Sequence, residues 1–327
     1  MANLGIPYMG SKQRLSKKIV DVILNNNPKC KYVYDLFGGG GSISFEFLKR
    51  PQIKKVIYNE LNTGVCELLR KIQKEGVTDE FYRWISREDF FKHKDDNDWF
   101  GGLLKTCWSF GNNHQKGYMF GKNIEEPKRL LHEVVVNKEL DCLEKFNKHF
   151  NLSLDISSMN QETINERRLE LQRIMTRQVK DKSVLKGFCV NEENSVRHIL
   201  QQLERLEQLQ KLEQLQQLEI SNKSFENVKI TTPIEETIIY LDPPYKNTAG
   251  YQCEVDFDFL YEFIEKSPYK IYISEYDLPF TEVASFDHRS ILSSNGFSKT
   301  TEKLYCNKQV DKNKKEVENT LFNFAID

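Results

Sequence analysis

Apolar and polar positions follow two different periods in the N-terminal part of the chain. Helical spacing covers residues 11–25, a stretch that ends at Lys49, and a stretch after Asn62, whereas short apolar runs at 31–34 and 54–58 predict buried strands. Strands that alternate with helices are typical of βαβ units and a parallel sheet. The pattern therefore predicts an α/β fold.

The pattern changes near residue 88 and returns at Leu218. Between them the chain is first aromatic and polar and then long, charged and helical, while strand patterning resumes at 218–230 and 237–241, followed by a helix at 257–266 and strands at 269–274 and 319–326. We predict an α/β core in two parts, 1–87 and 218–327. The mainly helical insertion between them, 88–217, is expected to carry target recognition.

Leucine recurs at every third position between residues 200 and 218. On an α-helix this spacing turns the leucine stripe by roughly 60° at each step, so the stripe cannot hold one face as a heptad does. The segment is therefore predicted to be a helix built from short repeats, not a leucine zipper, and it suggests no function.

Composition narrows the class of protein. With 39% hydrophobic and 29% charged residues, the chain has the composition of a soluble globular protein, and no apolar run is long enough for a membrane span. The N-terminal residues contain no signal-peptide core, so we expect a cytoplasmic location. The seven cysteines and six histidines show no metal-ligand spacing, and no metal is expected.

The net charge of −1 argues against binding of polyanions over the whole surface. Basic residues are nevertheless in excess in two places, residues 12–31 and 114–129. Each excess is compatible with a local basic face for nucleic acid or with an ordinary solvated helix.

Residues 35–42 place an acid, four glycines and a serine between a predicted strand and a predicted helix. Glycine lets a ligand approach the backbone, and free N–H groups at a helix start favour a carboxylate or phosphate. The dinucleotide motif fails because Ile43 stands where its third glycine would be, and the Gly-Lys-Ser/Thr of a P-loop is missing. The loop thus disfavours nicotinamide and ATP sites, while a structural turn stays open.

Glu60 ends the next predicted strand, 25 residues after Asp35. An acid there can accept hydrogen bonds from both hydroxyls of a ribose. Because the glycine loop has no lysine, the pair favours a nucleoside that bears an amino acid over one that bears a pyrophosphate. An exposed loop glutamate is the alternative.

The segment 242–245, Asp-Pro-Pro-Tyr, follows the apolar run 238–241. The exocyclic amine of adenine is a poor nucleophile, and a catalyst must offer acceptors to both of its hydrogens. Asp242 could accept one and the carbonyl of Pro243 the other, because consecutive prolines fix the backbone and add no donors. Tyr245 could stack on a base taken out of the duplex. The alternative is a strand that ends in a structural turn.

Three segments together resemble the signature motifs of the Dam-like (D12 class, alpha group) DNA adenine N6-methyltransferases. They are Tyr-Met-Gly-Ser-Lys at 8–12, Asp-Leu-Phe-Gly-Gly-Gly-Gly-Ser at 35–42 and Asp-Pro-Pro-Tyr at 242–245, in the order found in that group. The resemblance covers residues 5–70 and 218–275 well and the middle of the chain poorly.

The resemblance implies a Rossmann-like fold that binds S-adenosylmethionine. The methionine moiety would lie near Tyr8, Lys12 and Asp35, the ribose on Glu60, and the adenine near residues 224–225, where a serine replaces the acid often found in the family. The catalytic residues implied are Asp242, Pro243, Pro244 and Tyr245. The cofactor-binding residues implied are Tyr8, Lys12, Asp35, Phe37, Gly38, Gly40, Glu60, Ser224, Phe225 and Asp242.

Residues 107–123 loosely resemble the DNA-reading hairpin of the family. The side chains there that could contact bases or phosphates are Asn112, Asn113, His114, Lys116 and Lys122. The expected partners are double-stranded DNA and a cognate restriction nuclease, and the expected state is a monomer or weak dimer. No recognition sequence follows from the resemblance.

The function predicted is transfer of a methyl group from S-adenosylmethionine to N6 of a flipped adenine in duplex DNA. Two alternatives are a methyltransferase of an RNA base or a protein amide, and a catalytically silent DNA- or cofactor-binding accessory protein of a phage. The intact acid at 242 argues against the silent protein, whereas the serine at 224 and the leucine repeats leave room for it.

Overall fold

The computed structural model describes residues 4–8, 10–110, 117–181, 196–244, 255–275, 278–293 and 296–309. Its chain divides into two compact units. One unit consists of residues 12–38, 43–59 and 217–327 and contains the sheet, and the other consists of residues 1–11, 39–42 and 60–216 and is mainly helical.

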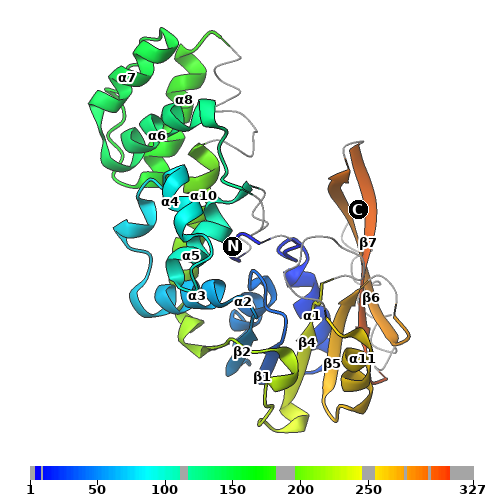
Figure 1. The fold of residues 1–327 in the computed structure, drawn as a ribbon. Helices are drawn as coiled ribbons and strands as arrows, with labels where there is room; N and C mark the ends of the chain where they lie inside the picture. The colour runs from blue at the N-terminus through cyan, green and yellow to red at the C-terminus, as the bar shows by residue number, and fades with distance from the viewer. Residues whose placement is uncertain are drawn as a thin grey trace. The chain divides into compact units, whose positions relative to one another are not determined.

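The first unit is built on a seven-stranded sheet in the order β3-β2-β1-β4-β5-β7-β6 (Figure 1). The strands are β1 (Tyr32–Asp35), β2 (Lys55–Asn59), β3 (Leu218–Ser221), β4 (Thr237–Leu241), β5 (Lys270–Glu275), β6 (Thr281–Ser293) and β7 (Gly296–Cys306). The first five run parallel, and β7 is antiparallel to both β5 and β6. The predicted α/β sheet is therefore present. The strand predicted at 319–326 lies outside the described residues.

Helices cover both faces of the central strands. On one face Ile239 and Ile271 belong to a core cluster with Leu260 of α11 (Phe257–Lys266). On the other, the hydroxyl of Tyr272 accepts a 2.8 Å hydrogen bond from Asn27, which directly follows α1 (Ser16–Asn26). Because both faces are buried, β4 is apolar at nearly every position instead of alternating.

The order of the parallel strands reverses between β1 and β4, which pair directly, with Asp35 opposite Tyr240. From β1 the chain continues to β2 and β3 on one side, and β4 is followed by β5 on the other. In open α/β sheets such a switch point leaves a crevice beyond the carboxyl ends of the two strands, where ligands bind. The segments after Asp35 and Leu241 both begin at this edge.

The second unit is helical. Its helices are α3 (Thr63–Glu75), α4 (Arg87–His93), α5 (Trp99–Leu103), α6 (Lys122–Asn137), α7 (Leu140–Phe150), α8 (Ile164–Gln178) and α10 (Val196–Gln210). The helix α2 (Ser42–Leu48) lies between β1 and β2 in the chain, and a π-helical turn, Leu104–Trp108, follows α5. Within the described part of 88–217 the only β pairing is a single bridge, between Ser109 and Tyr118.

The leucine repeat begins in α10, which packs against α3, α6 and α8. Leu200, Leu203, Leu206 and Leu209 are all at most 2% exposed. A stripe with a period of three spreads around a helix, so these leucines can all be buried only if other helices surround α10 on several sides. Leu215 is buried in the short helix Glu213–Gln217 and Leu218 in β3, so the repeat crosses three different elements.

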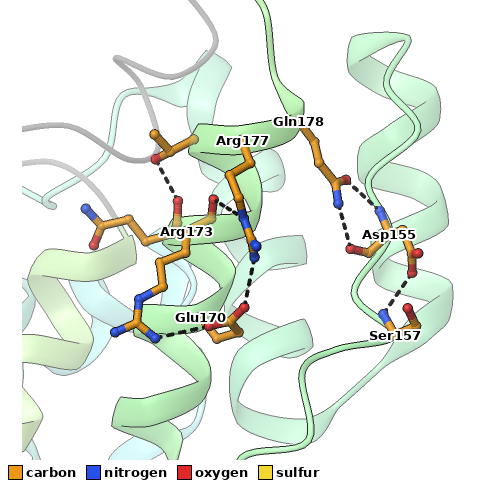
Figure 2. Close-up of polar contacts among 8 residues, drawn as sticks. Asp155, Ser157, Glu170, Arg173, Arg177 and Gln178 are labelled. Carbon is orange, nitrogen blue, oxygen red and sulfur yellow. Dashed lines mark hydrogen bonds and ion pairs between the residues drawn. The ribbon is translucent and has the colours of Figure 1, made fainter.

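Polar contacts fix α8 and the segment before it (Figure 2). Glu170 accepts hydrogen bonds of 3.1 Å from both Arg173 and Arg177 on the same helix. Gln178 at the end of α8 accepts a hydrogen bond from the backbone N–H of Asp155, and its amide donates to the carbonyl of Asp155. The helix begins with a capping box between Thr163 and Glu166, and at its end the N–H of Val179 donates to the carbonyl of Met175.

No helix in the described ranges combines the length and the apolar character that a membrane crossing requires.

Candidate active site

Asp242 follows β4 directly and is paired with Lys12. The Lys12 Nζ lies 2.9 Å from the Oδ1 of Asp242 and 3.2 Å from the Oε1 of Glu302 on β7. The backbone carbonyl of Lys12 accepts hydrogen bonds from Leu15 and Ser16 in the turn that leads into α1. The turn therefore fixes the lysine at the edge of the sheet where β4 ends.

The charges in this cluster act in opposite directions. Partial burial, together with the charge of Glu302, raises the pKa of Asp242 to about 6, although Lys12 opposes the change. Burial alone would lower the pKa of Lys12, but the two carboxylates raise it above its usual value. At neutral pH Lys12 is therefore an ammonium ion and Asp242 a carboxylate whose affinity for a proton is higher than usual.

Asp242 is less covered than its neighbours. Its side chain is 19% exposed, against 8% for Lys12 and 4% for Glu302. Pro243 is buried and Pro244 half-buried after it, so the backbone that leaves β4 is held by two fixed φ angles. The acid thus combines a fixed position with access for a ligand. Tyr245 lies outside the described residues.

Asp35 ends β1, the strand beside β4, and is 1% exposed. Its Oδ2 accepts a 2.7 Å hydrogen bond from the hydroxyl of Ser44 in α2. Asp35 and Asp242 are thus carboxylates at the ends of the two strands that form the switch point. Both residues were predicted for the site from the sequence.

The glycine loop is shaped in part by the protein's own side chains. A Cβ at Gly38 would lie 2.2 Å from the ring of Tyr58, which is fully buried in β2. The N–H of Gly38 donates to the carbonyl of Asn59 at 2.8 Å. The expectation of a free N–H group therefore does not hold at Gly38, and close packing explains why this position requires glycine.

In the helical unit, Glu60 is tied to the rest of the glycine loop. The N–H of Gly39 donates to its Oε2 at 2.8 Å, and the N–H of Asn62 donates to its Oε1 at 2.9 Å. Burial raises the pKa of Glu60. The backbone hydrogen bonds, and a further hydrogen bond from the hydroxyl of Tyr8, oppose the rise. The carboxylate is thus held by donors on several sides, and the N–H of Gly39 is occupied as well.

The N-terminal segment lies on the same loop. The N–H of Ile6 donates to the carbonyl of Gly40 at 2.8 Å, and a Cβ at Gly40 would lie 2.7 Å from the carbonyl oxygen of Ile6. The ring of Tyr8 would be 3.5 Å from a Cβ at Gly39, whose φ is +48°. Tyr8, Gly40 and Glu60, predicted from separate motifs, are therefore brought together within this unit.

The two residues predicted to contact the cofactor adenine, Ser224 and Phe225, already make contacts within the protein. Phe225 packs on Phe37 with ring centroids 5.2 Å apart, and both belong to the apolar cluster under α11. The Ser224 hydroxyl donates to Glu226. The serine thus engages a neighbouring acid in its own segment.

Two residues that sequence analysis did not single out have clear positions. Asn59 is buried at the end of β2, where its Nδ2 donates to the carbonyls of Leu36 at 3.1 Å and Lys223 at 2.9 Å. It thereby ties together the segments that follow β1 and β3. The position of Asn59 directly before Glu60 is a signal that could have identified it from the sequence. Nothing in the sequence pointed to Glu302.

Of the five predicted DNA contacts, only Lys122 lies within the described residues, and the segments 108–110 and 117–119 pair with each other before it. The N–H of Phe110 donates to the carbonyl of Gly117 at 2.9 Å, and that of Met119 to the carbonyl of Trp108 at 3.0 Å. Lys122 is exposed at the first position of α6. The other four predicted contacts lie outside the described residues; they are Asn112, Asn113, His114 and Lys116.

Among the described residues, no group of three or more His, Cys, Asp or Glu side chains is placed to hold a metal ion.

Comparison with known families agrees with the motifs. A family model described as D12 class N6 adenine-specific DNA methyltransferase matches residues 8–263. The match runs from Tyr8 to α11 and includes all three motif segments. No curated protein matches the chain.

Proposed function

Because the chain belongs to the D12 class N6 adenine-specific DNA methyltransferase family, we propose that Asp242 is the residue that receives the adenine amine in its reaction. Membership makes the chain an adenine-specific DNA methyltransferase that uses S-adenosylmethionine, and the predicted family and function are confirmed. The single observation that supports a role for Asp242 is its place. It is a partly exposed carboxylate fixed by Lys12 at the switch point of the sheet.

In the proposed reaction, Asp242 accepts a hydrogen bond from N6 of an adenine that has left the duplex. The carbonyl of Pro243 accepts a hydrogen bond from the second N6 hydrogen, so the nitrogen lone pair turns towards the methyl donor. When bound, S-adenosylmethionine supplies an electrophilic methyl group on its sulfonium. As the nitrogen–carbon bond forms and the carbon–sulfur bond breaks, N6 becomes cationic, and Asp242 helps to pass its extra proton to solvent. The products are N6-methyladenine, S-adenosylhomocysteine and one proton.

The residues of the sheet unit fit a sulfonium compound. Asp35 and Asp242 supply two carboxylates at neighbouring strand ends, and a sulfonium carries a positive charge. Phe37 and Phe225 offer aromatic surface beside them. We propose that Lys12 acts mainly on Asp242, because its ammonium is paired with that acid.

In the helical unit, Glu60 fits a ribose. A carboxylate has only acceptors, and about four lone-pair positions. Since the N–H groups of Gly39, Leu61 and Asn62 already donate to Glu60, a ribose hydroxyl would take the position now used by the hydroxyl of Tyr8. We propose that Tyr8 and Gly40 complete this part of the cofactor site. The hydroxyl of Ser224 is not assigned a cofactor contact while it is bonded to Glu226.

For target recognition we propose residues 88–217, between core segments 1–87 and 218–327. Lys122 is proposed to contact a DNA phosphate, because it is exposed at the first position of α6, five residues after Gly117 in the chain. The same proposal includes Asn112, Asn113, His114 and Lys116, and it places Tyr245 on the flipped base. We further propose a cytoplasmic enzyme, monomeric or weakly dimeric, that works with a cognate restriction nuclease.

The role of Asp242 is tested with Asp242→Asn, which keeps the shape of the side chain and removes its charge. Unmethylated genomic DNA is incubated with the enzyme and radiolabelled S-adenosylmethionine at saturating concentration, and label in the DNA is counted. We expect the rate to fall by about 100-fold or more, because a positioned base contributes roughly that much. Glu282→Gln, which neutralises an exposed acid on β6, is the control and should leave the rate unchanged. A folded Asp242→Asn enzyme with the wild-type rate would remove Asp242 from the mechanism.

A further inference from the structure

Lys12 is shared between two acids that come from different strands. Its Nζ lies 2.9 Å from Asp242 and 3.2 Å from Glu302, so neither carboxylate has the ammonium to itself. Glu302 is buried, and a buried acid is retained only where its charge is compensated. The three side chains together carry one net negative charge next to the expected position of the adenine amine.

The sheet explains how β7 reaches this place. β7 runs antiparallel to β5, and Glu275, the last residue of β5, pairs with Lys303. Glu302 is therefore one residue beyond the carboxyl end of β5, at the same edge of the sheet where Asp242 follows β4. A residue far along the chain is thus placed beside the motif acid by one antiparallel strand.

We infer that Glu302 is a positioning residue for methyl transfer, which holds Lys12 on the Oδ1 of Asp242 and limits how strongly Lys12 neutralises that acid. The inference rests on the proposed role of Asp242. A lysine paired with Asp242 alone would stabilise its carboxylate fully and make it a weak acceptor. Shared with Glu302, the lysine still orients Asp242, while the second carboxylate keeps Asp242 basic.

Other charges near Asp242 are few among the described residues. From β1, Asp35 is the acid at the neighbouring strand end. From β4, Tyr240 lies two residues before Asp242, and its hydroxyl is bonded to Ser274 of β5 at 2.7 Å. Burial, followed by the charge of Asp242, raises the pKa of Tyr240 well above its usual value, so it stays neutral. The remaining charged groups are Lys12 and Glu302, and the ammonium of Lys12 pairs with both Asp242 and Glu302.

The test compares Glu302→Gln with the wild-type enzyme over a range of pH. The amide keeps the size of the side chain and removes one negative charge from the surroundings of Asp242. We expect the acid-side midpoint of kcat/KM to move to lower pH by about one unit, because a like charge nearby is lost. We also expect kcat to fall by roughly tenfold, with KM for DNA within about threefold, since the contribution of a base depends on its basicity.

Glu282→Gln is the matched control. It makes the same chemical change on the adjacent strand, at an exposed acid that pairs with Lys303 at 3.5 Å. Its pH profile and kcat should equal those of the wild type. An equal shift in both variants would assign the effect to overall charge and contradict the inference, as would a folded Glu302→Gln enzyme with the wild-type pH profile.

Glu302→Asp covers the case in which the glutamine variant does not fold. Aspartate keeps the charge but shortens the reach to Lys12 by one carbon, so we expect the wild-type midpoint with a lower kcat. A folded Glu302→Asp enzyme with wild-type kcat would overturn the inference. If Asp242→Asn is inactive while Glu302→Gln behaves as wild type, only the positioning role fails; if Asp242→Asn is active, the proposed function of Asp242 fails instead.

Discussion

Asp242 is the residue on which the chemistry depends, and its surroundings balance two needs. A carboxylate that accepts a hydrogen from a weakly nucleophilic amine must be ionised at neutral pH and must still hold a proton well. Burial and Glu302 raise its pKa, whereas Lys12 lowers it, and the result is about 6. This value lies closer to neutrality than that of an ordinary aspartate, which favours general-base chemistry.

The pKa of Asp242 predicts a pH profile. The base acts only when unprotonated, so kcat/KM should rise with pH and reach half its plateau near pH 6, the pKa of Asp242 in the free enzyme. The measurement is initial methyl transfer to DNA in buffers of constant ionic strength. An acid limb centred near about 3.9, the value of an unperturbed aspartate, would contradict the electrostatic account.

Gly38 provides a second prediction at the residue scale. Gly38→Ala would place a Cβ 2.2 Å from the buried ring of Tyr58, and a rigid ring in a packed core cannot move aside easily. We expect a loss of about 1–3 kcal/mol in the free energy of unfolding, measured by denaturant titration. Gly121→Ala is the control, because nothing lies within 4 Å of its Cβ position. Equal stability of the two variants would show that Tyr58 does not restrict the loop.

At the scale of elements, the strands that depend on a short-range pattern of apolar residues could be predicted from the sequence. The strands that became β1, β2, β4 and β5 are apolar runs bounded by polar residues, and their positions agree with the structure within a few residues. The predicted strand at 218–230 is shorter, because β3 ends at Ser221 and a short 3₁₀ helix follows it. Just after β3, the N–H of Lys223 donates to the side chain of Asn59 and does not extend the ladder.

The hairpin of β6 and β7 was missed, and the reason is physical. Both strands contain many polar and charged residues, and they form because β7 adds to the edge of β5. Strand propensity depends on such neighbours and not on the segment alone. Glu302 was missed for the same reason: its role depends on the register that sets it beside Lys12, whereas the motif residues Asp35, Glu60 and Asp242 could be recognised from the sequence.

The central helix of the helical unit supports a prediction at the element scale. Leu206 in α10 is completely buried, so Leu206→Ala leaves a cavity between helices. We expect a destabilisation of about 2–5 kcal/mol, measured as the free energy of unfolding in urea. The same change at Leu140, which is 61% exposed, should cost less than about 0.5 kcal/mol. A small effect at Leu206 would mean that α10 is not the core of this unit.

For the whole molecule, DNA binding should depend on a few basic residues, because the net charge is −1. Lys122→Ala should weaken binding to all duplex sequences alike and reduce the slope of log K against log salt by about one, as expected for one phosphate contact. Lys74, which is 82% exposed in α3, is the control. An unchanged salt slope for Lys122→Ala, measured by fluorescence anisotropy, would exclude a phosphate contact at this position.

Asp242, at the switch point of this sheet, is proposed to enable methylation of adenine N6 in DNA. Nucleoside mass spectrometry of DNA tests it most directly, in cells that lack other adenine methylation and express either the wild-type chain or Asp242→Asn at equal levels. We predict N6-methyladenine in the DNA of cells with the wild-type chain and none above background with the variant. Equal amounts of N6-methyladenine in both would contradict the claim.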